Sequence, residues 1–226
     1  MQMRNYRIKI ELLSDMCVSD GGIYNSAIDT DICYDEYGFP YIPAKRLKGC
    51  LRECALELKD WGMPIGVQEM FGTQGNDDSD SEKAGKAGAV HIRDAYIADK
   101  ECFVSEIRQN QSVSPVLCHP QNILKVFSYV RTQTSIDYET GVAQEQSLRI
   151  MRVANKGLVF YAAVEMDEKY EKELKNCLAV LKHMGIARTR GFGEIKATLE
   201  VQAEKNNPVK CAAYQQNADY LEYEIR

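Results

Sequence analysis

Several cationic side chains and one glycine lie close together in the segment 41–58, YIPAKRLKGCLRECALEL. Lys45, Lys48 and Arg52 recur at helical spacing, so a helix would place them on one face. Gly49 lies among them, and because it has no Cβ it would let a ligand approach the backbone closely. A helix N-terminus beside these cations suits a phosphate chain, although an ordinary surface helix with solvated cations has the same pattern. The candidates for phosphate binding here are Lys45, Arg46, Lys48, Gly49 and Arg52.

A second candidate for phosphate binding is the glycine-rich segment 185–195, GIARTRGFGEI. Its arginines supply guanidinium groups and its glycines expose backbone N–H groups, and both kinds of donor bind phosphate oxygens. Phe192 offers a ring on which a base can stack. The alternative is a turn that needs its glycines for steric reasons, with Phe192 packed in the core. The candidates in this segment are Arg188, Arg190, Gly191, Phe192 and Gly193.

Carboxylates gather in the long segment 14–35, which precedes the basic stretch. The acids that we consider as candidates are Asp29, Asp31 and Asp35, near the end of this segment. A loop of this length in a compact domain is usually functional or disordered. Turn-forming aspartates and solvated charge explain the same residues without any chemistry, so both interpretations stay open.

The basic stretch needs a helix with an apolar face on its other side. Pro43 suits the first turn of such a helix, because the N–H that proline lacks would have no partner there. The apolar positions that follow at helical spacing are Leu47, Leu51, Cys54, Ala55 and Leu58. Upstream, residues 6–13 alternate between apolar and charged side chains, which predicts a half-buried strand before the carboxylate loop.

Further elements are predicted in the middle of the chain. Residues 89–98 and 124–130 have the composition of strands, with the Ser/Gln/Pro-rich segment 105–121 between them. Residues 131–146 are mostly polar and contain a turn at 139–141. This pattern indicates either a projecting hairpin or a plain surface loop.

The elements from residue 148 onward complete a recognisable order. Two strands, 148–153 and 158–166, are expected around a short turn, and then a helix that Asp167 caps. We expect that helix to run to Met184 and to end at Gly185, before a last strand at 194–202. The order is strand, helix, paired strands, helix, strand. It predicts an α+β, ferredoxin-like (RRM-like) βαββαβ core, residues 1–207, with a large insertion at about 62–146.

Composition limits the class of protein. The chain has 226 residues and a formal net charge of −5, so a nucleic-acid site must be local rather than spread over the surface. The eight cysteines form no CxxC pair, which favours reduced thiols of a cytoplasmic protein and gives a zinc site little support. No apolar run approaches the length that crosses a bilayer. The polar segment 76–82, NDDSDSE, is expected to make a surface excursion.

Three groups of residues together resemble the RAMP superfamily of CRISPR proteins, especially subunits of type III effector complexes. They are Tyr41-Ile42-Pro43 with Leu47-Lys48-Gly49 and Arg52; Thr134-Ser135-Ile136-Asp137 with Thr140-Gly141 and Arg149; and Gly185 with Arg188, Arg190 and Gly191-Phe192-Gly193. The resemblance implies domains that line up along a guide RNA and hold its backbone with the first helix and the glycine-rich loop. It also implies a thumb-like hairpin between guide and target RNA, and other effector subunits as partners.

The resemblance also implies a possible endoribonuclease activity. In the backbone subunits of this family, an Asp shortly before the Pro-led helix cleaves target RNA with a divalent metal, here Mg²⁺. The matching segment is 27–31, so Asp29, Asp31 or neither has this role. Its surroundings depart from the family pattern, because Ala44-Lys45-Arg46 replaces the usual Gly-Ser-Ser. A non-catalytic structural subunit is the alternative.

Two other readings have less support in the sequence. A guide-processing endonuclease of this family usually relies on a histidine, and none of the three histidines, His91, His119 and His183, is expected near the first helix. A stand-alone RRM is not expected, because aromatic base-stacking positions are not evident on the central strands. Residues 208–226 are expected to be a linker and the first strand of a second RAMP domain, since 219–226 alternates as residues 5–11 do.

Overall fold

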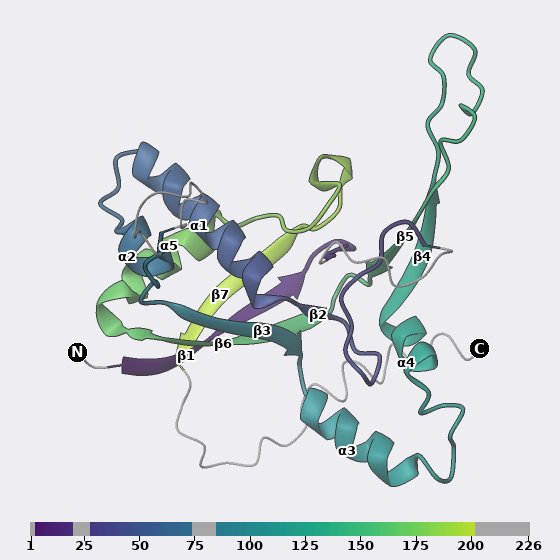
Figure 1. Ribbon diagram of the computed structural model, residues 1–226, viewed down its shortest axis with the longest axis horizontal. Helices are drawn as coiled ribbons and strands as arrows, with labels where there is room; N and C mark the ends of the chain where they lie inside the picture. The colour runs from purple at the N-terminus through teal and green to yellow at the C-terminus, as the bar shows by residue number, and fades with distance from the viewer. Residues whose placement is uncertain (1–2, 20–27, 74–84, 202–226) are drawn as a thin grey trace.

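The computed structural model describes residues 3–19, 28–73 and 85–201 (Figure 1). The acidic segment 76–82 and the expected linker and strand at 208–226 lie outside these ranges. The centre of the fold is a five-stranded antiparallel sheet with the strand order β2-β3-β6-β1-β7. Its strands are β1 Met3–Leu12, β2 Tyr41–Ile42, β3 His91–Ile97, β6 Val159–Asp167 and β7 Ile195–Val201.

Helices cover one face of this sheet. They are α1 Ala44–Asp60, α2 Val67–Phe71 and α5 Glu171–Val180, which follows the 3₁₀ turn η1 Glu168–Tyr170. The core forms because alternate residues of β1, from Tyr6 to Leu12, point toward the apolar stripe of α1 and are buried. The buried residues of α1 are Leu47, Leu51, Cys54, Ala55 and Leu58, the same set that the helical spacing predicted.

The strand order and the helix pair are consistent with the ferredoxin-like plan, but the strands that carry it differ from the expectation. β3 is the second core strand, although it lies within the segment 62–146 that was assigned to an insertion. The strand expected to pair with β6 is instead β5 Arg149–Ala154, which pairs with β4 Ser128–Gln133. The reason is topological: β1 and β3 already pair with both edges of β6.

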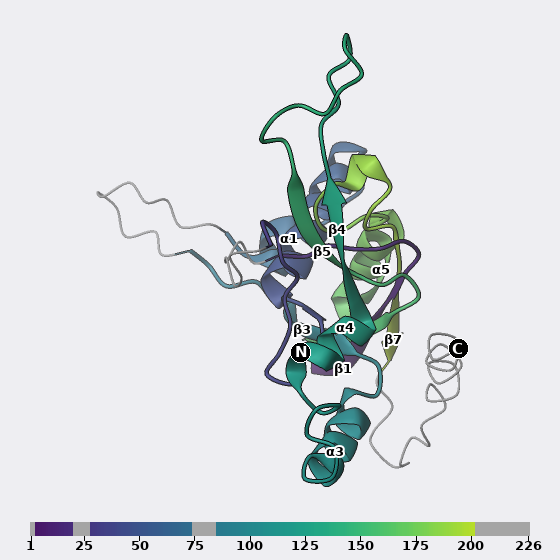
Figure 2. The same ribbon diagram turned by 90° about the vertical axis from the view of Figure 1, so that its right-hand side faces the viewer.

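β4, β5 and the loop 134–148 form a hairpin that projects from the body of the molecule (Figures 1 and 2). This confirms the hairpin expected around residues 131–146. Its tip turn is closed by Asp137, whose carboxylate accepts hydrogen bonds from the backbone N–H groups of Glu139 and Thr140 at 3.0 and 2.9 Å. These bonds hold the pKa of Asp137 below its usual value.

Other differences concern helices. Of the strand expected at 124–130, only 128–130 are in a strand, as the start of β4; residues 124–127 belong to α4 Pro120–Phe127, which begins at a proline. α3 Lys100–Asn110 covers the first residues of the Ser/Gln/Pro-rich segment 105–121. α5 ends at Val180, not at Met184, because the next residues pair with the start of β7. The N–H of Ile195 donates to the Lys182 carbonyl at 2.8 Å, and Gly185 therefore does not cap the helix. In the part of the chain that the structure describes, no helix has the length and apolar character needed to span a membrane.

Candidate nucleic-acid interface

The burial of the apolar stripe on α1 fixes which of its side chains face outward. Lys45 and Arg46 are exposed, whereas Lys48 and Arg52 are half-buried. Gly49 is exposed, and a Cβ placed on it would meet no atom within 4 Å. The backbone at Gly49 is therefore open to a ligand, as the sequence predicted, and the cations stand around it.

These cations have no acidic partner among the described residues. No side chain among Lys45, Arg46, Lys48, Arg52 and Arg188 forms an ion pair in the described ranges. The Nε atom of Arg52 is also buried without a hydrogen-bond partner there. An unsatisfied buried donor costs about 1–3 kcal/mol. This surface therefore has donors and positive charge that a ligand can satisfy.

The N-terminus of α1 is less available for phosphate binding than the sequence suggested. The Asp94 carboxylate, from β3, accepts a hydrogen bond from the Ala44 N–H at 2.7 Å. A negative side chain thus already occupies the start of the helix. Phosphate binding at this surface must therefore rely on the side chains around Gly49 rather than on the helix terminus.

The glycine-rich loop brings Arg188 to the same surface. The 3₁₀ turn η2 Arg188–Arg190 lies in this loop. Burial raises the pKa of the Cys50 thiol on α1, and Arg188 and Arg46 act against that rise because both cations lie near it. Arg188, Cys50 and Glu53 line one pocket of about 210 Å³. The loop and α1, more than 130 residues apart in sequence, therefore form one surface.

The pocket beside α1 has a mixed lining. Glu57 and His183 line it too, so acidic and basic groups face the same space. His183 thus lies beside the first helix in space although it is far from it in sequence. The expectation that no histidine lies near the first helix is therefore wrong, and the reason is that α5 ends early, at Val180, so that the chain brings His183 back to α1.

The loop's remaining candidate residues are less accessible than its arginines. Phe192 is 4% exposed, and the guanidinium of Arg131 lies 4.9 Å from its ring centroid. A Cβ at Gly193 would lie 1.8 Å from the Met184 carbonyl oxygen. The N–H of Gly193 donates to the Asp15 carbonyl at 2.8 Å. Phe192 is thus packed in the core and is not a ring exposed for base stacking, and Gly193 is needed because the backbone of Met184 lies too close for a side chain. Gly191 is exposed, with φ of 81° and no atom within 4 Å of a Cβ.

The loop also contacts the base of the hairpin. Arg190 donates from Nη1 to Oε1 of Gln133 on β4 at 3.3 Å. Tyr129 donates from its hydroxyl to Asp15 at 2.7 Å, which raises the pKa of Tyr129. The glycine-rich loop thus contacts the hairpin directly and lines one pocket together with α1. The accessible candidates of α1 and of the loop form what we call the basic surface: Lys45, Arg46, Lys48, Gly49, Arg52, Arg188, Arg190 and Gly191.

The candidate acids differ in their surroundings. Asp29 is exposed, and its Oδ2 accepts a hydrogen bond from the Ile150 N–H of β5 at 2.7 Å. Asp31 is buried and forms an ion pair with buried Arg152 at 3.0 Å. Asp35 closes a turn by accepting from the N–H groups of Tyr37 and Phe39. Only Asp29 among these three carboxylates is exposed to a ligand in solution.

The described residues give little support for a metal site or for a reactive cysteine. Within the described ranges, no group of three or more His, Cys, Asp or Glu residues is arranged to hold a metal ion. The cysteines of those ranges form no disulfide. Burial raises the pKa of Cys17 and of Cys177 to about 12, so both are neutral thiols at pH 7.

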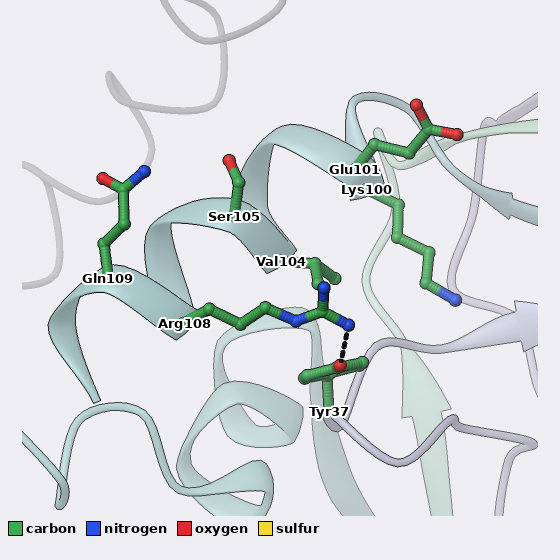
Figure 3. Close-up of a pocket in the computed structure, with 7 residues that line it drawn as sticks. All are labelled: Tyr37, Lys100, Glu101, Val104, Ser105, Arg108 and Gln109. Carbon is green, nitrogen blue, oxygen red and sulfur yellow. Dashed lines mark hydrogen bonds between the residues drawn. The ribbon is translucent and has the colours of Figure 1, made fainter. Parts of the chain in front are cut away.

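A wider hollow lies at α3, with a volume of about 580 Å³ (Figure 3). Arg108 spans it and donates to the Tyr37 hydroxyl at 2.7 Å. Lys100, at its other end, is paired with Asp35 at 2.6 Å. No residue of the basic surface lines this hollow.

One comparison with known proteins identifies the family of this chain. The model of the RAMP superfamily matches residues 9–196. A chain of a type III-B Cmr-beta complex bound to cognate target RNA is 13% identical, with a TM-score of 0.60 over 86% of this chain and 96% of that one. A chain of a type IV-B CRISPR complex is 12% identical, with a TM-score of 0.51 over 91% and 94% of the two chains. No curated protein matches. At these identities, the structural likeness shows a shared fold.

Proposed function

Because the chain belongs to the RAMP superfamily, we propose that it is a guide-RNA-binding subunit of a type III CRISPR interference complex in antiviral defence. The observation that carries this proposal is the set of cations around Gly49 that lack an acidic partner among the described residues. The similar chain in a Cmr-beta complex bound to target RNA supports the choice of complex.

The proposed binding mode follows from the basic surface. Lys45, Lys48 and Arg52 contact successive phosphates, and the bare backbone at Gly49 lets the RNA lie close to α1. Arg188 and Arg190 contact the same strand from the glycine-rich loop. Neutralised phosphates release their counterions, which gives sequence-independent affinity. The hairpin projects beside this path and separates guide from target RNA.

Co-purification tests the assignment. The tagged chain is expressed with the other effector subunits and a CRISPR array, and the RNA that co-purifies is sequenced. We expect short RNAs with repeat-derived ends, and their loss from the complex when Lys48 and Arg188 are both alanine. An unchanged yield of co-purified RNA with the double-alanine variant would contradict the proposal, because the complex would then hold its RNA without this chain's contacts.

We further propose that Asp29 takes part in cleavage of the target RNA. It fits an Mg²⁺ site only in part, because it is one exposed carboxylate, and Mg²⁺ is commonly held by one or two carboxylates together with phosphate oxygens and water. When bound, the ion would stabilise negative charge on the phosphate. Asp29 would hold the ion against the RNA, and its hydrogen bond to the Ile150 N–H would orient the carboxylate.

The cleavage test compares Asp29→Ala with Asp29→Asn in the reconstituted complex, with a labelled target RNA and Mg²⁺. Because only a carboxylate binds the ion well, we expect both variants to bind target RNA normally and to lose cleavage. His183→Ala serves as the matched control and is expected to cleave normally. Full cleavage by both Asp29 variants would leave the chain a non-catalytic RNA-holding subunit, which is the alternative function.

A further inference from the structure

The strand register places three tyrosines side by side across three neighbouring strands. Tyr41 of β2 is paired with Tyr96 of β3, and Tyr96 is paired with Tyr161 of β6. The rings of Tyr41 and Tyr96 lie 5.7 Å apart between centroids. On the next two strands the same row continues with Lys9 of β1 and Thr198 of β7. We call these five residues the tyrosine row.

The tyrosine row lies on the face of the sheet opposite to the helices. The strand neighbours of its members, such as Ile8, Ala95 and Phe160, are buried in the core below α1 and α5. Alternate residues of a strand point to opposite faces, so the row points away from that core. α1 and α5 are the helices with close backbone contacts to the sheet among the described elements, and Figure 2 shows both on one side of β1, β3 and β7.

The rings and the cations of this face are accessible in part. All three tyrosines are half-buried, and Thr198 is exposed. The guanidinium of Arg7 lies 4.5 Å from the centroid of Tyr161, and the ammonium of Lys100 lies 3.7 Å from that of Tyr96. Each of these two cations thus lies over one face of its ring, and a base that stacks on that face has to displace the cation or stack on it.

Two acids of this face form ion pairs within the sheet, whereas Glu11, two residues from Lys9 on the same side of β1, forms none with a described residue. Glu200 forms an ion pair with Arg7 at 2.6 Å, and Glu165 forms one with Arg93 at 3.4 Å. Lys9, in the middle of the row, has no ion pair with a described residue. The face therefore offers aromatic rings together with Lys9, a cation that has no ion-pair partner among the described residues.

We propose that the tyrosine row is a second binding site for single-stranded RNA, separate from the basic surface. Sheets that bind RNA stack two or three bases on aromatic side chains of neighbouring strands. Here Tyr41, Tyr96 and Tyr161 supply the rings, and Lys9 and Thr198 supply a charge and a hydroxyl for phosphate or ribose. The guanidinium plane of Arg7 can itself stack on a base.

This site corrects the expectation that base-stacking positions are absent from the central strands. The row was hidden in the sequence because its three tyrosines come from three segments whose pairing was not predicted. β3 was assigned to an insertion, and a register shift between Ile92 and Ala95 decides which of its residues faces Tyr161. The site goes beyond the proposed function, because it lies on another face and does not depend on the basic surface.

The test measures RNA affinity in two backgrounds, the wild type and Lys48→Ala/Arg188→Ala. The probe is a fluorescein-labelled, unstructured 12-nucleotide RNA, and the variants are Tyr96→Val/Tyr161→Val and, as the matched control, Tyr96→Phe/Tyr161→Phe. Valine keeps the strand propensity but removes the ring, whereas phenylalanine keeps the ring. Thermal unfolding verifies that each variant is folded, and the sites of ultraviolet crosslinks to RNA are mapped by mass spectrometry.

We expect the valine pair to weaken binding roughly ten-fold or more in the Lys48→Ala/Arg188→Ala background, where the tyrosine row is the remaining site and each stacked base contributes measurably, while the phenylalanine pair changes affinity by less than about two-fold. Crosslinks should fall in β3 and β6. Equal RNA affinities of the valine and phenylalanine pairs would overturn the inference. If the valine pair then impairs only assembly with other subunits, the face is a protein interface.

The same data separate the two proposals. If Lys48→Ala/Arg188→Ala weakens binding and the valine pair does not, the tyrosine row fails and the basic surface stands. If only the valine pair weakens binding, the basic surface fails and the tyrosine row stands. If both proposals hold, each double variant leaves one site intact, and only the combined variant loses the affinity that remains.

Discussion

Asp29 and Asp31 are two positions apart, yet the structure gives them different roles. Asp29 is exposed beside β5, whereas Asp31 is enclosed with Arg152. The sequence placed both acids in one loop but could not tell them apart. The distinguishing partner, Arg152, is 121 residues away, and only the tertiary structure brings it to Asp31.

Stability measurements distinguish the two acids. Asp31→Ala should lower the free energy of unfolding by about 3–5 kcal/mol, because it leaves the Arg152 guanidinium buried without its partner. Asp29→Ala should cost no more than about 1 kcal/mol, the value of an exposed hydrogen bond. Urea unfolding of both variants measures this difference. Equal losses would show that the buried ion pair does not stabilise the fold.

At the scale of elements, periodic apolar patterns predicted the helices and strands that bury one regular face. α1 and β1 follow from apolar spacing alone, because each buries one regular face. The pairing of β3 with β6 and the helical state of α4 do not follow, since they depend on which sheet edges are already occupied. The polar hairpin was predictable from its turn, whereas its contacts with the glycine-rich loop were not.

The glycines of the basic surface allow a test of function against packing. Gly49 is in the interior of α1 with open space around it, so Gly49→Ala should raise stability by about 1 kcal/mol through helix propensity. If the backbone here contacts RNA, Gly49→Leu should weaken RNA binding although the helix remains intact. Circular dichroism with thermal unfolding and fluorescence anisotropy measure the two effects.

Gly193 is the matched control for this comparison. Its Cβ would overlap the Met184 carbonyl, and its φ is 72°, so Gly193→Ala should lower stability rather than raise it. RNA affinity of the folded fraction should then be unchanged. Normal RNA binding by Gly49→Leu would show that the bare backbone of α1 has no role in binding.

At the scale of the whole molecule, an acidic protein is proposed to bind a polyanion. The net charge of −5 does not prevent this, because the cations of α1 and the glycine-rich loop meet on one surface while ion pairs neutralise charges elsewhere. The sequence predicted both cationic segments. Their contact through Arg188 and Cys50 required the fold, because it joins the first helix to the loop before the last strand.

The most direct test of the basic surface is the salt dependence of RNA affinity. The Kd of the full chain for a 12-nucleotide RNA is measured from low to high salt for the wild type and Lys48→Ala/Arg188→Ala. Lys59→Ala/Lys125→Ala, with the same change in net charge outside the surface, is the control. Losing two phosphate contacts should weaken binding and reduce the slope of log Kd against log salt by about 1.4. An affinity and slope equal to those of the control would contradict the account.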